Sequence, residues 1–284
     1  MVKIISDSTC DLCRELLDKY DISILPLHIL LGDKEFEDGR DITIEEIYAW
    51  SEIHKETPKT SAPSIDRAIK VFEPYVKMGD EIVCFSISGT MSSSGNIMRM
   101  AAKHLEAENR IHVIDSMNLS TGIGLLVIEA AAMAKEGRTA EEIVERMEEL
   151  IPRVRASFVV DTLVYLHRGG RCSGLAAMAG GALKLHPRIQ VVDGVMQSAK
   201  KYRGSLDKVI MSYVKDMEED LKTADRTRVF ITHSGCNKDI VERVRQYLEE
   251  LGVFSEIWET RAGGVVSSHC GPGTLGVLFI AADS

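Results

Sequence analysis

The chain has 284 residues, 45% of them hydrophobic, and its 34 Lys and Arg residues against 43 Asp and Glu residues leave a net charge of −9. This length and composition are typical of a soluble globular protein, more often with two domains than with one. The excess of negative charge argues against a nucleic-acid phosphate backbone as the main partner, so we expect no nucleic-acid binding.

We expect neither a targeting segment nor a membrane-spanning segment in this sequence. Its first residues, Met-Val-Lys-Ile-Ile-Ser-Asp-Ser, lack the long apolar core of a secretory signal. The most membrane-like run, 172–183, is bounded by Arg171 and Lys184 and is far shorter than the roughly 20 residues that cross a bilayer. We therefore expect a cytoplasmic protein with no integral membrane segment.

Strand-like apolar runs alternate with amphipathic segments of helical period through the first half of the chain. Strands are expected at 2–5, 22–31, 82–87 and 111–114. Helices are expected at 11–20, after Thr43, after Ser64, from 97, at 122–134 and after Thr139, with capping boxes at Thr43 and Thr139. Such alternation predicts a mostly parallel sheet with helices packed against it.

Ligands of parallel sheets bind beyond the carboxyl ends of the strands. This rule predicts that Ser8, Thr60, Ser93 and Ser116 lie along one edge of the sheet.

Hydroxyl side chains cluster at one strand-to-helix turn, within residues 80–96. Backbone N–H groups at the start of a helix lack internal partners and carry the positive end of the helix dipole. The side chains that add neutral donors there are Ser88, Thr90, Ser92, Ser93 and Ser94. The turn has two interpretations, an anion-binding site or an ordinary serine-rich cap.

The second half again contains both strands and helices. Asp193-Gly194 predicts a two-residue hairpin between strands at 189–192 and 195–198. The other expected elements are a strand at 156–160, one long amphipathic helix over 206–221, a strand at 228–232, a helix at 240–251 and strands at 254–258 and 275–281. Residues 172–184 are nearly all small or apolar, which fits either a tightly packed helix pair or a surface that a ligand approaches closely.

Two short stretches resemble motifs of cofactor, redox or metal sites. Residues 271–276 match G-x-G-x-x-G, but a strand follows where a dinucleotide site needs a helix. Cys10 and Cys13 form a C-x-x-C at a helix start, where the pKa of a thiol would be lowered, yet no second ligand pair is present. We expect no metal and no cofactor, and leave a redox role of the two cysteines open.

A hydrolase or a nucleotide-dependent enzyme would need other signals. The sequence contains neither a P-loop nor a G-x-S-x-G motif. His233 or His269 with Asp7 or Asp115 could still join a serine in space, so a stand-alone serine enzyme remains an alternative.

Six short motifs are spread over nearly the whole chain. They are Ser-Asp-Ser-Thr-Cys-Asp-Leu at 6–12, Thr-Ser-Ala-Pro-Ser at 60–64, Ser-Gly-Thr-Met-Ser-Ser at 88–93, Asp115-Ser116 with Ser120 and Gly122, Tyr165-Leu166 with Gly169-Gly170-Arg171, and His-Cys-Gly-Pro-Gly at 269–273. Together they resemble the DegV family of bacterial fatty-acid-binding proteins. Because six separate motifs agree, the resemblance is specific, and it favours the anion-site interpretation of the hydroxyl turns.

The resemblance implies an α/β protein with two domains that encloses one long-chain fatty acid. The N-terminal domain, 1–153, is expected to be a three-layer α/β/α structure with a mostly parallel sheet and to carry the carboxylate-binding turns. The C-terminal domain, 154–284, is expected to contain a mixed sheet and to enclose the acyl chain. The carboxylate is expected at the junction between the two domains.

The resemblance also implies roles for individual residues. The residues expected to bind the carboxylate are Thr60, Ser61, Gly89, Thr90, Ser93, Arg171 and His269. The acyl tunnel is expected to include Ala177, Gly180 and Gly181. No residue is expected to be catalytic.

Family members of this type present the bound acid to a separate fatty acid kinase, which phosphorylates its carboxyl group for phospholipid synthesis. The resemblance therefore implies a non-catalytic carrier with a kinase subunit as its partner. Two alternatives stay open, a stand-alone hydrolase or phosphotransferase with Ser93 as nucleophile, and a lipid sensor without a kinase partner.

Four positions depart from the family's pattern. They are Cys13, where Pro is common, Ala62, where Gln is common, 185–187, where a Lys-Pro pair is usual, and Cys270, where Thr or Ser is common. The last two lie nearest the expected head-group site or domain junction, so partner contacts and fine selectivity are where this chain is expected to differ.

Overall fold

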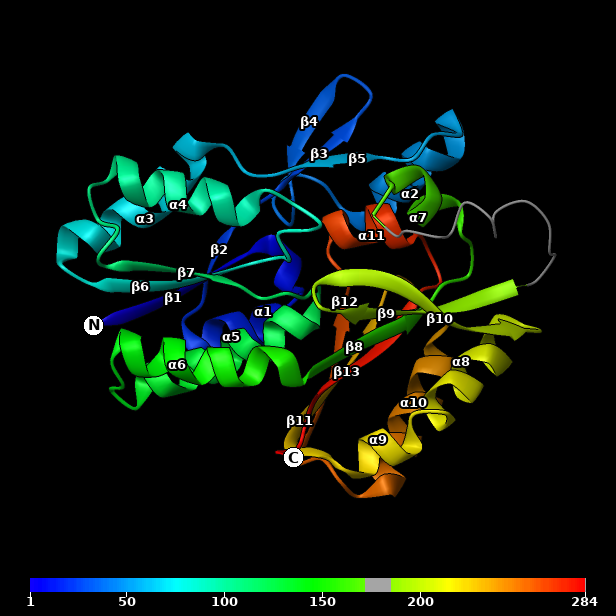
Figure 1. Cartoon of the computed structure of the whole chain (residues 1–284). Coiled ribbons are helices and arrows are strands. Elements are labelled where there is room, and N and C mark those ends of the chain that lie inside the picture. The colour runs from blue at the N-terminus through cyan, green and yellow to red at the C-terminus, as the bar shows by residue number, and fades with distance from the viewer. Residues whose placement is uncertain (172–184, 284) are drawn as a thin grey trace.

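The computed structural model describes residues 1–171 and 185–283, and within them it contains three sheets (Figure 1). The first sheet consists of parallel strands. Its strands are β1 (Val2–Asp7), β2 (Ser23–Leu25), β6 (Glu81–Ser86) and β7 (Ile111–Asp115). They pair in the order β2-β1-β6-β7, and every pair is parallel, as the alternation of strands and helices predicts. We call this sheet A.

Helices cover both faces of sheet A. One layer consists of α3 (Ile65–Met78) and α4 (Ser94–His104). The other consists of α1 (Arg14–Tyr20), α5 (Thr121–Lys135) and α6 (Ala140–Leu150) (Figure 1). The expected three-layer arrangement is therefore present.

Local caps set several of these helix boundaries. Thr43 and Glu46 form a capping box at the start of α2 (Ile44–His54), and Thr139 and Glu142 form one at the start of α6. The Ser64 side chain accepts a hydrogen bond from the backbone of Arg67 and begins α3. These three starts are confirmed.

The single strand expected over 22–31 is wrong. The segment forms two short strands, β2 in sheet A and β3 (His28–Leu31) in a separate sheet, because Pro26 between them has no N–H for a ladder hydrogen bond. β3 pairs antiparallel with β4 (Lys34–Glu37) and with β5 (Lys59–Ser61), and we call these three strands sheet B. Thr60 therefore lies within β5 and not beyond a strand of the parallel sheet.

The second half forms a six-stranded mixed sheet, sheet C. Its strands are β8 (Val154–Val159), β9 (Leu185–Val192), β10 (Val195–Arg203), β11 (Ala224–His233), β12 (Glu256–Arg261) and β13 (Leu275–Ala281). They pair in the order β10-β9-β8-β13-β11-β12, with only β11 and β12 parallel within the described residues. The Asp193-Gly194 hairpin is confirmed, since both residues have positive φ and Val192 faces Val195.

The helix expected over 206–221 is interrupted. It forms α8 (Leu206–Lys215) and the short α9 (Glu218–Lys222), with Met217 between them outside helical geometry. The interruption follows Asp216, whose carboxylate accepts a hydrogen bond from Tyr202 on β10. Together with α10 (Lys238–Leu251), these helices cover one face of sheet C.

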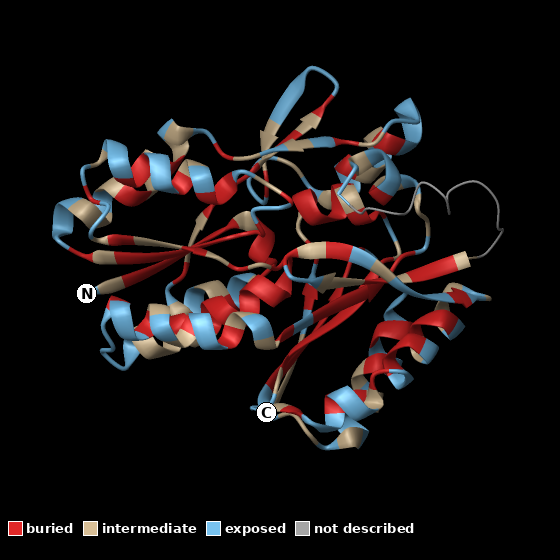
Figure 2. Ribbon diagram, in the orientation of Figure 1, coloured by how far each residue is buried: buried red, intermediate tan, exposed pale blue. Residues whose placement is uncertain are grey.

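Helix α5 lies in the middle of the molecule. It contacts β1 and β6 of sheet A as well as β8, β11 and β13 of sheet C, and ten of its residues are buried. One apolar cluster accordingly joins Phe85 of β6, Leu126 of α5 and Phe158 of β8, and Figure 2 shows the strands on both sides of the helix as buried. The division into domains at 153 and 154 stays a prediction.

Candidate functional site

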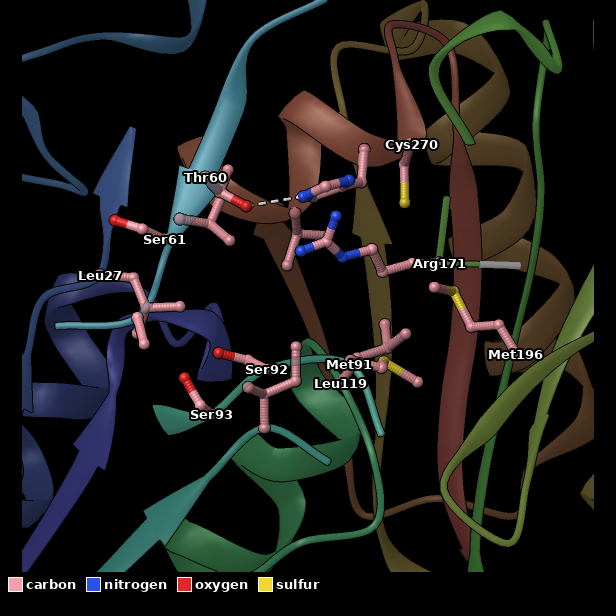
Figure 3. Close-up of a pocket in the computed structure, with 15 residues that line it drawn as sticks. Leu27, Thr60, Ser61, Met91, Ser92, Ser93, Leu119, Arg171, Met196 and Cys270 are labelled. Carbon is pink, nitrogen blue, oxygen red and sulfur yellow. Dashed lines mark hydrogen bonds between the residues drawn. The ribbon is translucent and has the colours of Figure 1, made fainter. Parts of the chain in front are cut away.

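A cavity of about 270 Å³ lies where segments from both halves of the chain meet (Figure 3). Its walls come from β5, the turn between β6 and α4, β10, Arg171 shortly after α7 (Val164–Gly169), and α11 (Gly264–Cys270). The lining side chains are mostly apolar. The residues are Leu27, Thr60, Ser61, Ala62, Ile87, Met91, Ser92, Ser93, Leu119, Arg171, Met196, Val265, Val266, His269 and Cys270.

Thr60 and His269 form the polar contact at one wall of this cavity. The Thr60 Oγ1 and His269 Nε2 atoms are 2.7 Å apart, although 209 positions separate the residues in the sequence (Figure 3). Nδ1 of the same imidazole is buried and has no hydrogen-bond partner among the described residues. The ring packs against Gly169, where a Cβ atom would lie only 2.4 Å from Nδ1, so a larger residue would displace it.

The imidazole of His269 is uncharged at neutral pH. Burial lowers its pKa to about 4, and the nearby guanidinium of Arg171 acts in the same direction. A neutral imidazole donates through one ring nitrogen and accepts through the other. Among the described residues that line the cavity, the cation is therefore Arg171, whose Nη1 donates to the Gly169 carbonyl at 2.7 Å and whose side chain extends toward Thr60 (Figure 3).

Ser92 and Ser93 lie on the wall opposite Thr60, at the start of α4 (Figure 3). Ser93 is the first residue before the helix, but its side chain does not cap the helix backbone. Ser92 does accept a hydrogen bond, from the backbone of Ser94 at 3.2 Å. The Ser93 hydroxyl is thus not used by the helix and faces the cavity.

Gly89 and Thr90, which the family resemblance assigns to the carboxylate, do not line the cavity. The Thr90 hydroxyl donates to the Gly194 carbonyl at the tip of the β9–β10 hairpin, and Ser88 Oγ donates to the same oxygen at 2.8 Å. The Gly89 amide donates to the carboxylate of Asp115 at 3.1 Å. These residues hold the hairpin to the turn, and we call the Ser88, Thr90 and Gly194 contacts the hairpin clamp.

Three buried carboxylates position the walls, a role that was not predicted for any of them from the sequence. Asp7 accepts from the Ile87 amide at 2.9 Å and from Ser94 Oγ at 2.8 Å, which fixes the turn before α4. Burial raises its pKa, against the effect of these donors.

Asp11 and Asp38 bind the start of α11, the helix that carries His269. Asp11 accepts from the Gly263 amide at 2.8 Å, and Asp38 accepts from the Gly264 amide at 2.8 Å. Burial raises the pKa of Asp38 to about 6 and that of Asp11 well above its ordinary value. Asp11 belongs to the Ser-Asp-Ser-Thr-Cys-Asp-Leu motif, so the motif could have indicated its role at the site. Nothing in the sequence around Asp38 indicates a role for that residue.

The individual apolar residues that line the cavity were also not predicted from the sequence. Its main members are Leu27, Met91, Leu119, Met196, Val265 and Val266. The expected tunnel residues Ala177, Gly180 and Gly181 lie outside the described residues.

The described residues do not assemble a reactive C-x-x-C at Cys10, a serine-enzyme triad or a metal site. Burial raises the pKa of the Cys10 thiol to about 12, so the expectation of a lowered thiol pKa is wrong for Cys10. His233 contacts Glu259 at 3.4 Å, and His269 contacts Thr60, with no carboxylate bonded to its Nδ1. Within 1–171 and 185–283 there is also no group of three metal-binding side chains and no helix long and apolar enough to cross a membrane.

Comparison with known proteins identifies the family. The model of the DegV family, described as uncharacterised proteins, matches residues 1–282. The chain belongs to the DegV family. A DegV domain-containing protein of Clostridium acetobutylicum is 33% identical over 98% of both chains, and one of Caldanaerobacter subterraneus is 34% identical over 98% of both.

Solved structures of DegV proteins share the fold. A DegV family protein from Thermus thermophilus described as binding fatty acid superposes with a TM-score of 0.90 at 28% identity, covering 99% of both chains. A stearic-acid-binding protein from Eubacterium ventriosum superposes with a TM-score of 0.87 at 30% identity, covering 99% of this chain and 98% of that one.

Proposed function

We propose that this DegV protein binds one long-chain fatty acid, with the carboxylate beside Thr60, Ser93, Arg171 and His269. The observation that carries the proposal is the composition of the cavity, in which hydroxyls, a neutral imidazole and one guanidinium adjoin an otherwise apolar wall. A fatty acid has the same two-part chemistry. The DegV relatives described as fatty-acid-binding support the assignment.

The polar groups supply what a carboxylate needs when it leaves water. A buried carboxylate costs several kcal/mol unless donors replace its hydration, and a guanidinium provides charge-assisted hydrogen bonds. If His269 carries its proton on Nε2, it donates to Thr60 Oγ1, and the Thr60 hydroxyl hydrogen is then left for the ligand. We propose that the bound carboxylate selects this tautomer.

The apolar wall supplies the affinity. Each methylene that leaves water contributes about 0.8 kcal/mol, so the acyl chain accounts for most of the binding free energy before ordering costs. Side chains such as Met91, Leu119 and Met196 are nearly fully buried and adaptable in shape, which suits an acyl chain. The tunnel role of Ala177, Gly180 and Gly181 belongs to this proposal.

We further propose that the protein is a non-catalytic carrier in the cytoplasm that presents the acid to a separate fatty acid kinase. His269 contacts Thr60 instead of a serine, and its Nδ1 has no carboxylate partner among the described residues, which disfavours a stand-alone serine enzyme. A lipid sensor would use the same cavity. Transfer of phosphate from ATP to the bound acid, with a fatty acid kinase added, separates the carrier from the sensor.

The first test is extraction of the freshly purified protein with denaturing solvent, followed by mass spectrometry. We expect about one equivalent of fatty acid per chain, and its mass reports the chain length. A protein that is empty, and that also fails to take up added palmitate or oleate, would contradict the proposal and return Ser93 to consideration as a nucleophile.

The second test is Ser93→Ala in a fluorescent fatty acid displacement assay. Loss of one charge-assisted hydrogen bond is expected to weaken binding by about 1.5–3 kcal/mol, or roughly 10- to 150-fold, with the fold intact. Ser205→Ala is the matched control, because Ser205 also precedes a helix, α8, without capping its backbone through the side chain, and does not line the cavity. Equal affinities of the Ser93→Ala and wild-type proteins would count against the carboxylate site.

A further inference from the structure

A second cavity, of about 450 Å³, lies between β8, β9 and α9. It shares no lining residue with the cavity proposed for the fatty acid. Arg188 and Gln190 project into it from β9, and Arg155 and Ser157 from the adjacent strand β8. Two cationic side chains therefore line one groove in a chain whose net charge is −9.

Arg188 is the unusual residue of this groove. Its Nε atom is buried without a hydrogen-bond partner, and no hydrogen bond or ion pair of its guanidinium is found among the described residues. The guanidinium carbon lies 5.6 Å from the centre of the Tyr213 ring, which favours the cation without using its N–H donors. Five N–H donors in planar geometry are thus held in place at a cavity wall.

The nearest carboxylates do not satisfy this cation. Asp216 is close enough to influence Arg188 electrostatically, but its carboxylate already accepts from Tyr202 at 2.7 Å and pairs with Lys200. Asp193 and Asp220 also line the groove, and both residues are exposed to solvent. Because Nε has almost no exposed surface, a ligand in the groove would be held by the two Nη groups, which form no hydrogen bond among the described residues.

We infer that this groove binds a small oxyanion, a phosphate or carboxylate group, on the guanidinium of Arg188. A planar guanidinium matches both groups with two parallel hydrogen bonds. Arg155 supplies the second positive charge, although its Nη1 also donates to the Pro152 carbonyl at 2.8 Å. Met217 and Phe279 on the remaining walls favour a ligand that carries a compact apolar body on its anionic group.

The inference does not depend on the fatty acid proposal. Arg188 points toward α8 on one face of sheet C, whereas Met196 of the first cavity packs in the apolar cluster around α5. A ligand on Arg188 would therefore be separate from an acyl chain beside Met196.

The test is isothermal titration of wild-type protein with inorganic phosphate and, separately, with acetate, which has no acyl chain to fill the first cavity, at constant ionic strength set by chloride. Binding is expected for at least one of the two anions, and the stronger one identifies the group. Arg188→Met is expected to weaken that binding by about tenfold or more, since it removes the guanidinium and keeps an apolar stem. Arg171→Met is the matched control, because it removes the guanidinium of the first cavity instead.

The two variants must give opposite results in two assays. Arg188→Met should lose the anion while retaining fatty acid displacement, and Arg171→Met should do the reverse. Arg188→Lys keeps the charge and is expected to bind with intermediate affinity, which covers the case in which the methionine variant does not fold. Absence of binding by both anions, or equal binding by wild type and both Arg188 variants, would overturn the inference.

Discussion

His269 illustrates how a single buried side chain couples the site to pH. Its pKa is about 4 in the folded protein, against about 6.5 for an unperturbed histidine. Between these two values the unfolded chain binds a proton that the folded protein does not bind at His269. Acidification through this window therefore favours unfolding, and above pH 6.5 the contribution vanishes.

We predict that replacing His269 by Gln removes this part of the pH dependence. As pH falls from 7 to 5, the ligand-free wild type should lose stability relative to His269→Gln by at most about 1.4 kcal/mol per pH unit. Urea unfolding of both proteins at several pH values measures the difference. Parallel stability curves for the two proteins would contradict a lowered pKa.

Asp38 changes stability with pH in the direction opposite to His269. The stability of wild type must therefore be compared with that of His269→Gln at each pH. The pKa of Asp38 is raised to about 6, so the folded state takes up a proton before the unfolded chain does, and acidification through pH 6 stabilises the fold. This contribution is present in wild type and variant alike. It cancels in the difference and leaves the effect of His269.

At the scale of elements, the hairpin clamp links the serine-rich turn to the cavity. Gly194 has positive φ, and a Cβ atom there would lie 2.7 Å from Ser88 Oγ, so the contact requires glycine. Met196 follows two residues later and lines the cavity with 4% of its surface exposed. Ser88 and Thr90 therefore fix the position of β10 and, through Met196, the shape of this wall of the cavity.

We predict that Ser88→Ala combined with Thr90→Val speeds release of a bound fatty acid. Loss of two hydroxyl donors to one carbonyl frees the hairpin tip, and a change of about 1 kcal/mol corresponds to a dissociation rate about fivefold higher. Stopped-flow displacement of a fluorescent fatty acid measures it. Ser64→Ala controls for loss of a hydroxyl elsewhere, and an unchanged rate in the double variant would show that the clamp does not act on the ligand.

The sequence predicted those elements whose signal is local. Strand–turn–helix alternation, two capping boxes and the Asp-Gly turn each lie within a few residues, and the structure has all of them. Sheet B was missed because β5 is only Lys-Thr-Ser, with no apolar alternation, and is held by partners about 30 positions away. Turn geometry likewise directs Thr90 to a carbonyl 104 positions away, which spacing cannot reveal.

At the scale of the whole molecule, α5 makes the two halves depend on one another. A helix that is apolar all round must be covered on every side, and here both sheets cover it. Gly124 allows the close approach, because a Cβ atom there would lie 3.0 Å from the Cys10 carbonyl oxygen. The two halves thus share the apolar cluster around α5, and each half also has a cluster of its own.

We predict that both halves unfold in a single transition. The chain contains two tryptophans, Trp50 in the first half and Trp258 in the second, so Trp50→Phe and Trp258→Phe each leave one reporter. Their fluorescence midpoints in urea should coincide, because neither half keeps its core when the other unfolds. Clearly separated midpoints would indicate independent domains.

We also predict that Leu126→Ala destabilises both reporters together. Leu126 is fully buried in α5, and loss of a large core side chain costs about 2–5 kcal/mol. Val192→Ala is the control, since Val192 is 37% exposed at the hairpin. A shift at only one tryptophan would contradict a shared core.

The strand order of sheet C has a consequence for synthesis on the ribosome. β13 lies between β8 and β11 and pairs antiparallel with both, yet it is translated after each of them. Until it emerges, β8 and β11 each present an unpaired edge, and α5 lacks part of its cover. The nascent chain is therefore exposed to aggregation and chaperone binding late in translation, and deletions within 275–281 should act on folding yield far more than their distance from the cavity indicates.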